Sequence, residues 1–199
     1  MLSLEVRQLV VTRGDRTVID GLSFQVVPGE VLHLLGRNGA GKTSLLEVLC
    51  GLRQSEGGEI VSGPDDSQRH WVGHKNALNP VLSALENLQF WAGLNDVTLA
   101  DPKAAMDAVG LNPRHANRPS GQLSTGQKRR AALARLVAVP RPWWFLDEPL
   151  AGLDVQGLAL FADLLSRHAA GGGAVLVTSH QPLPGDLPTL RHLDLSAAV

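Results

Sequence analysis

One glycine-rich segment has the residue types and spacing that bind phosphate groups. Residues 36–43 satisfy the whole pattern Gly-x-x-x-x-Gly-Lys-Thr. Glycines let backbone amides approach phosphate oxygens, a lysine can bridge the β- and γ-phosphates, and a threonine hydroxyl can complete a Mg²⁺ shell. We therefore predict a nucleoside triphosphate site, with Lys42 on the phosphates and Thr43 on the metal. Its loop residues are Gly36, Arg37, Asn38, Gly39, Ala40, Gly41, Lys42 and Thr43.

Two adjacent carboxylates close a later apolar stretch. Asp147 and Glu148 follow the aromatic run 143–146 and precede Pro149. Two acids at the end of a buried strand need a charge partner, and a magnesium nucleotide supplies one. We predict that Asp147 holds Mg²⁺, directly or through water, and that Glu148 orients and deprotonates the attacking water. The alternative is a strand that simply runs out into solvent at two acids.

Strands that alternate with helices must position these groups. The apolar run 31–35 predicts a buried parallel strand that leads into the glycine-rich loop, and a helix follows to about residue 49. Further helices are expected after Gln127 and over 155–169, and the segment 75–122 is helical in character except for a loop at 112–120. This alternation predicts an α/β fold. Other strands are expected at 4–6, 9–12, 17–19, 22–27, 143–146 and 174–177.

Composition narrows the class of protein further. The 199 residues suit one domain, here taken as 2–199, and the net charge of -1 gives no basic face for general nucleic-acid binding. The single cysteine, Cys50, excludes an internal disulfide. The first residues lack the features of a signal peptide, and no apolar stretch is long enough to span a bilayer. We therefore expect a cytoplasmic protein that relies on a partner for any membrane function.

The pentapeptide Leu-Ser-Thr-Gly-Gln at 123–127 carries the most specific information in the chain. Ser124 and Gln127 have the spacing of a capping box, so a helix should begin there and point its amides at an anion. The three basic residues that follow, 128–130, are expected to form a solvated turn.

Together these motifs resemble those of the ATP-binding cassette (ABC) ATPases over nearly the whole chain. The resemblance extends to Ala-Gly-Leu-Asp at 151–154 and Thr-Ser-His at 178–180. It implies a P-loop NTPase core (1–74 and 123–199) with an N-terminal antiparallel β subdomain and a helical subdomain at about 75–122. It also implies that His180 contacts the γ-phosphate and acts with Glu148 and Lys42 in catalysis.

The resemblance also implies a head-to-tail homodimer with composite ATP sites. In such a dimer each pentapeptide contacts the ATP held by the other copy, through Ser124, Thr125, Gly126 and Gln127. Two positions depart from the family pattern. His74 stands where the family has a glutamine near the metal, and its imidazole can contact Mg²⁺-bound water. Arg13 stands where an aromatic residue stacks on adenine, and a guanidinium can also stack on a base.

Within the family, the chain resembles the ATPases of cytochrome c maturation, and His74 and Gln181-Pro182 are the residues that distinguish this resemblance. This implies integral membrane partners on the cytoplasmic face of the bacterial inner membrane, and haem export or release of a haem-loaded chaperone, with no haem bound by this chain. Three alternatives stay open: another small ABC importer or exporter, a soluble ABC protein acting on nucleic acid or the ribosome, and an assembly module without useful hydrolysis.

Overall fold

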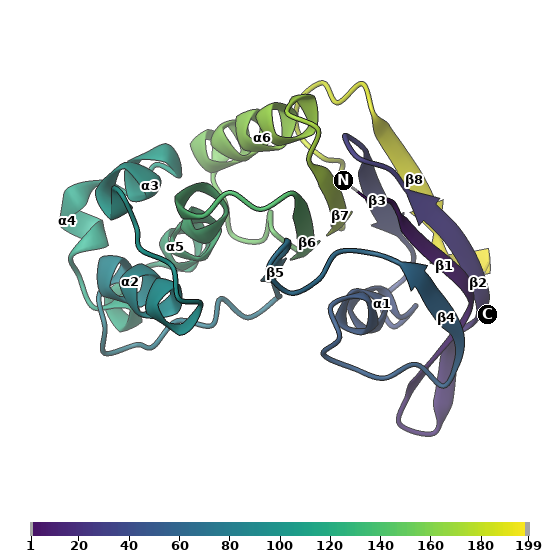
Figure 1. The fold of residues 1–199 in the computed structure, drawn as a ribbon. Coiled ribbons are helices and arrows are strands. Elements are labelled where there is room, and N and C mark those ends of the chain that lie inside the picture. The colour runs from purple at the N-terminus through teal and green to yellow at the C-terminus, as the bar shows by residue number, and fades with distance from the viewer. Residues whose placement is uncertain (1, 198–199) are drawn as a thin grey trace.

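The protein consists of two sheets and a group of helices, as Figure 1 shows. The computed structural model describes residues 2–197. The strands are β1 (Leu4–Arg13), β2 (Arg16–Val26), β3 (Val31–Leu35), β4 (Gly57–Ser62), β5 (Arg69–Val72), β6 (Trp143–Asp147), β7 (Ala174–Thr178) and β8 (Leu190–Asp194). The helices are α1 (Lys42–Leu49), α2 (Ala84–Leu94), α3 (Pro102–Ala108), α4 (Pro113–Ala116), α5 (Thr125–Ala138) and α6 (Val155–Ala170), with 3-10 turns at Ser120–Gln122 and Leu195–Ala197.

A parallel sheet positions the chemistry of the molecule. Its strands run in the order β5-β6-β7-β3-β8, and every neighbouring pair is parallel. The carboxyl ends of parallel strands meet at one edge of the sheet, which is where α/β proteins bind ligands. The loops after β3, β6 and β7 therefore meet there, although long segments of chain separate them.

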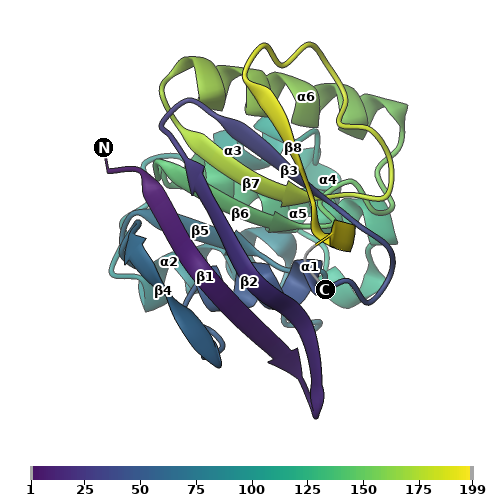
Figure 2. The same ribbon diagram turned by 90° about the vertical axis from the view of Figure 1, so that its right-hand side faces the viewer.

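The faces of this sheet belong to two different cores. Along β6, Trp143 and Phe145 pack on one side, whereas Trp144 and Leu146 pack on the other, because successive strand side chains point in opposite directions. The first core holds α1 between the parallel sheet and the antiparallel sheet, whose strands lie in front in Figure 2. The second core joins the parallel sheet to α2, α3, α5 and α6.

The N-terminal strands are longer than the sequence predicts. Instead of four short strands there are two, β1 and β2, which pair antiparallel with several register shifts, and β4 joins the other edge of β1. Gln8 has a φ of 48°, so it breaks the strand locally. A Cβ on Gly58 would lie 2.2 Å from the Gln8 carbonyl oxygen, so only glycine allows β4 this close to the irregular point.

The helical group follows its sequence signals closely, with one exception. The predicted capping box of α2 is confirmed: the Glu86 amide donates to Ser83 Oγ at 3.1 Å, and the Ser83 amide donates to the Glu86 carboxylate at 2.8 Å. The loop predicted at 112–120 is wrong in part, because it contains α4. Asn112 caps this short helix and Pro113 occupies its first position, a combination that favours a helix start.

The longest helix, α6, has 16 residues and buries Phe161, Leu164 and Leu165 against the second core. Within residues 2–197, no helix combines the length and the apolar character that a membrane crossing needs.

The burial of His70 on β5 predicts that the protein loses stability in acid. The ring of His70 is 2% exposed, and this burial lowers its pKa to about 4, although Nε2 lies 2.7 Å from the Val139 carbonyl oxygen. The unfolded chain, with an ordinary histidine pKa, binds the proton more readily. The contribution of His70 to the free energy of unfolding is therefore fully present above pH 6.5 and is lost as the pH falls towards 4.

We expect the His70→Gln variant, which keeps an N–H donor for Val139, to have a shallower pH dependence of stability. Between pH 7.5 and 5, the free energy of unfolding of the wild type should fall by about 2 kcal/mol more than that of the variant. Urea denaturation at both pH values measures the difference. Parallel losses in the two proteins would show that His70 is not the group responsible.

Candidate functional site

The glycine-rich loop joins β3 to α1 and has the backbone geometry of an anion cradle. Gly36, Gly39 and Gly41 have positive φ angles of 142°, 85° and 92°. A Cβ on Gly41 would lie 3.0 Å from Val18, so this close packing against β2 requires glycine. Gly41 caps α1 without a side-chain hydrogen bond, which leaves the helix N-terminus available to an anion.

Lys42 lies over this loop with its charged end inside it. Its Nζ donates to the carbonyl oxygens of Gly36 at 2.7 Å and Arg37 at 3.2 Å. The residue is only 8% exposed and forms no ion pair with a carboxylate among residues 2–197. A buried ammonium without a counter-ion suits the binding of an anionic ligand.

A network of oxygen atoms links the loop to the ends of β6 and β7. The Thr43 hydroxyl lies 3.1 and 3.0 Å from the two carboxylate oxygens of Asp147, although 104 residues separate them. The Thr178 hydroxyl donates to the same carboxylate at 2.8 Å and accepts from the Glu148 amide at 2.9 Å. Hydroxyl and carboxylate oxygens are the ligands that Mg²⁺ prefers, so Thr43 and Asp147 fit this metal.

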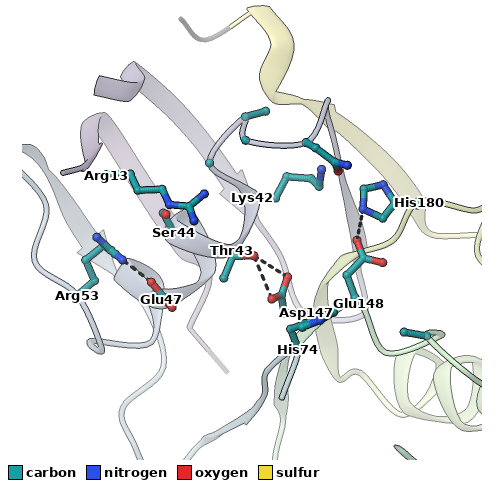
Figure 3. A pocket seen from close by; sticks show the side chains of 15 residues that line it. Arg13, Lys42, Thr43, Ser44, Glu47, Arg53, His74, Asp147, Glu148 and His180 are labelled. Carbon is teal, nitrogen blue, oxygen red and sulfur yellow. Dashed lines mark hydrogen bonds and ion pairs between the residues drawn. The ribbon is translucent and has the colours of Figure 1, made fainter. Parts of the chain in front are cut away.

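Glu148 turns away from the strand into the pocket. Its φ of 52° lies in the left-handed region, which is costly for a residue other than glycine and recurs at functional sites. Its side chain is 16% exposed, and Oε1 lies 3.3 Å from Nε2 of His180. The dashed line between the two side chains in Figure 3 marks this contact. This buried oxygen makes no hydrogen bond with any residue in 2–197, so an acceptor remains free beside the histidine.

These groups surround one pocket of about 430 Å³, which Figure 3 shows from close by. It collects most of the residues that the sequence predicts for the nucleotide and the metal, including Arg13 and His74. Ala151, from the Ala-Gly-Leu-Asp motif, also lines it, as do Ser44, Glu47 and Arg53, for which the sequence analysis predicted no contact with the nucleotide. The predicted residues in the lining are Arg13, Asn38, Gly39, Ala40, Gly41, Lys42, Thr43, His74, Asp147, Glu148 and His180.

Two of these additional residues, Arg53 and Glu47, form an ion pair near Arg13, the residue expected to stack on adenine. Arg53 Nε lies 2.9 Å from the Glu47 carboxylate, and its Nη1 donates to the Thr12 carbonyl at 3.3 Å. The pair therefore ties α1 to the end of the strand that carries Arg13. The spacing of two ordinary charged residues in the sequence contains no signal for this contact.

The pentapeptide lies apart from this pocket. None of residues 124–127 lines it, and both Ser124 and Thr125 are exposed. The capping box is confirmed, since the Gln127 amide donates to Ser124 Oγ at 3.2 Å and the Ser124 amide donates to the Gln127 side chain at 3.0 Å. A Cβ on Gly126 would lie 2.4 Å from the Gly152 carbonyl oxygen, so glycine is required where this segment meets the turn before α6.

The solvated basic turn expected at 128–130 is wrong for two of its three residues. Arg129 is 2% exposed and Arg130 is 6% exposed. Arg130 forms an ion pair with Asp154 and donates to the carbonyl oxygens of Val109 and Gly110, both at 3.2 Å. It therefore joins α5 to the segments before α4 and α6, which gives this buried charge its partners.

Comparison with known proteins agrees with this geometry. The family model described as "ABC transporter" matches residues 19–151. Two relatives are named cytochrome c biogenesis ATP-binding export protein CcmA. The one from Rhodopseudomonas palustris is 47% identical and covers 99% of this chain and 100% of its own length. The one from Vibrio cholerae is 40% identical, with 96% and 98% covered.

Solved structures share the fold at lower sequence identity. A putative ABC transporter ATP-binding protein from Pyrococcus furiosus superimposes with a TM-score of 0.84 at 22% identity, with 99% of each chain covered. The dimeric structure of the bacterial ABC transporter cassette MJ0796 gives 0.79 at 22% identity, with 96% and 94% covered. The predicted α/β cassette fold is thus confirmed. The chain belongs to the ABC transporter ATPases and, among these, to the family of cytochrome c biogenesis ATP-binding export proteins.

Proposed function

We propose that this chain is the ATP-hydrolysing subunit of a membrane complex for the maturation of c-type cytochromes. One observation carries the hydrolytic part: Glu148 Oε1, which makes no hydrogen bond within residues 2–197, lies 3.3 Å from His180 Nε2 in the pocket that Lys42 and Thr43 also line. The names of the relatives, at 40–47% identity over nearly the full chain, support the cytochrome c part.

Binding begins at the loop, whose amides and Lys42 take the phosphates of ATP. Thr43 and Asp147 would hold Mg²⁺, and His74 would contact a water molecule on it. When bound, Mg²⁺ neutralises charge on the phosphate oxygens. Arg13 would stack on the base at the outer end of the pocket.

Hydrolysis then needs a base and a positioned water. Glu148 accepts a proton from the water while the water oxygen attacks the γ-phosphorus. The bond from that phosphorus to the β-γ bridging oxygen then breaks, and ADP leaves. His180, 3.3 Å from Glu148, would hold that carboxylate in place and contact the γ-phosphate.

The position of the pentapeptide supports a head-to-tail homodimer. Ser124 to Gln127 lie outside the pocket of their own chain, with Ser124 and Thr125 exposed at the capped start of α5. In a dimer this helix end would meet the γ-phosphate of the ATP bound by the second copy. Two composite sites would then form between the two chains.

The membrane part of the function depends on partners. The chain would associate with integral membrane subunits at the cytoplasmic face of the bacterial inner membrane. ATP hydrolysis would support haem export or the release of a haem-loaded chaperone. The scattered histidines of this chain, such as His70 and His74, supply no haem site in this proposal.

Affinity purification from membranes in mild detergent tests the partner assignment. We expect a tagged chain to retain integral membrane subunits that serve c-type cytochrome assembly, identified by mass spectrometry. Cells with the untagged chain provide the background. Recovery of an unrelated permease instead would assign the ATPase to another transporter and overturn the cytochrome c part of the proposal.

A further inference from the structure

A buried arginine connects the helix of the pentapeptide to the edge of the nucleotide pocket. Arg129, in the second turn of α5, is 2% exposed. Its Nη1 donates to the Gly73 carbonyl at 3.0 Å, and its Nη2 donates to the His74 carbonyl at 2.8 Å. These are the first two carbonyl groups after β5 ends at Val72. The two ends of the guanidinium therefore hold two successive peptide units.

The charge of Arg129 is costly where it lies. Among residues 2–197 it forms no ion pair with a carboxylate, and its Nε has no hydrogen-bond partner. Burial lowers its pKa, while the charges of Asp147 and Glu148 act in the opposite direction. An apolar side chain of similar size would avoid this desolvation cost. The catalytic carboxylates are thus the charges that favour the buried cation.

The held segment is the one that places His74. A Cβ on Gly73 would lie 3.1 Å from the Trp71 ring, so the backbone has little freedom on that side. On the other side the Arg129 fork holds it, and His74 lines the pocket together with Thr43 and Asp147 (Figure 3). A shift of α5 would therefore move His74 relative to these two groups.

A second arginine of the same helix provides a natural comparison. Arg135 lies six residues, or about 1.7 turns, further along α5, and its pKa is also lowered by burial. It makes one hydrogen bond to the same loop, to the Ala77 carbonyl at 2.9 Å. The charges of Asp147 and Glu148 do not contribute to its pKa shift. Arg135 is half-buried rather than fully buried, and both residues contact the loop, but of the two only Arg129 reaches the His74 backbone.

We propose that Arg129 is a positioning residue that fixes the His74 backbone at the metal side of the pocket and couples it to the start of α5. The inference rests on the ATP hydrolysis proposed above. The guanidinium presents two donor nitrogens at a fixed separation on a long side chain, whereas the ammonium of a lysine at position 129 is a single point on a shorter side chain and does not reproduce this two-nitrogen geometry.

The test compares Arg129→Met with Arg135→Met and wild type. In Arg129→Met we expect kcat for Mg-ATP to fall about 10- to 100-fold, the range seen when a group that orients a metal-site residue is removed. Binding of a fluorescent ATP analogue without Mg²⁺ should stay at the wild-type level, because the phosphate loop is untouched. In nucleotide-free protein, hydrogen exchange at the His74 and Lys75 amides should be faster. Arg135→Met should keep wild-type kcat and wild-type exchange at these two amides.

A double variant separates positioning from general loss of structure. If Arg129 acts through His74, Arg129→Met combined with His74→Ala should lose no more kcat than His74→Ala alone. Additive losses would overturn the inference, as would wild-type kcat in Arg129→Met or an equal loss in Arg135→Met.

The remaining outcomes also decide the question. If Arg129→Met does not fold, Arg129→Lys replaces it, and the same loss of kcat and faster exchange are expected. Wild-type behaviour of Arg129→Lys would then overturn the inference. A wild-type protein that hydrolyses no ATP would instead refute the proposed function, whatever the variants do.

Discussion

Glu148→Gln is expected to stop ATP turnover while leaving ATP binding intact. Glutamine has nearly the same shape and can still lie beside His180, but it cannot accept the proton of the attacking water. General-base catalysis contributes about 10²–10⁴ in rate, so kcat should fall by at least about 100-fold. In the proposed dimer, hydrolysis is the step that separates the two chains, so the variant should accumulate as an ATP-bound dimer.

Two measurements check this expectation. Phosphate release gives kcat, and light scattering coupled to size-exclusion chromatography, with Mg-ATP in the buffer, gives the mass of the particle. Glu59→Gln is the matched control, because it is the same replacement at an exposed position of β4 outside the pocket. Undiminished hydrolysis in Glu148→Gln would remove Glu148 from its role. If Glu148→Gln does not hydrolyse ATP but remains a monomer in Mg-ATP, Glu148 keeps its role as general base and the trapped dimer is refuted.

The sequence predicts best what is local. The loop at 36–43 and the caps at Ser83 and Ser124 need only residues within a few positions of one another, and both capping boxes are confirmed. The parallel strands β3, β6 and β7 are also predicted, because they are buried on both faces and read as continuous apolar runs. Helix α4 was missed because its start signals lie within a polar, proline-bearing stretch.

What the sequence cannot show depends on tertiary packing. Strands β4, β5 and β8 are short and partly polar, and each lies at the edge of a sheet, so their neighbours rather than their own pattern define them. Arg129 and Arg130 follow a polar motif and look like surface residues. They are buried because carbonyl groups distant in sequence accept their hydrogen bonds, which no local rule reveals.

The strained backbone at Glu148 is another feature that depends on tertiary packing. Beside this left-handed φ, the Thr178 hydroxyl accepts from the Glu148 amide and donates to the Asp147 carboxylate at the end of the sheet. Asp147 pairs with Thr178 in the register of β6 and β7. The motif identifies the acid, but the contact of its backbone amide with the neighbouring strand is not visible in the sequence.

Two inactive variants should restore activity to each other if the ATP sites are composite. Ser124→Asp keeps a good helix cap but places a negative charge where the γ-phosphate of the second copy would lie. Lys42→Met removes the cation that binds the phosphates within one chain. Each homodimer then has two defective sites, so we expect both variants alone to be nearly inactive.

A heterodimer of these two variants has one intact site and one doubly defective site. The intact site pairs the unaltered loop of the Ser124→Asp chain with the unaltered pentapeptide of the Lys42→Met chain.

Co-expression with two different tags and purification on both isolates this species, and its kcat per dimer should reach about half that of wild type if the sites act independently. Thr98→Asp, which also replaces an exposed hydroxyl residue by a carboxylate but lies outside both motifs, should stay fully active. If the heterodimer is as inactive as its parent homodimers, either hydrolysis requires two intact sites or each pentapeptide contacts the ATP bound by its own chain. Ser124→Asp with wild-type turnover would establish that the pentapeptide does not contact the γ-phosphate.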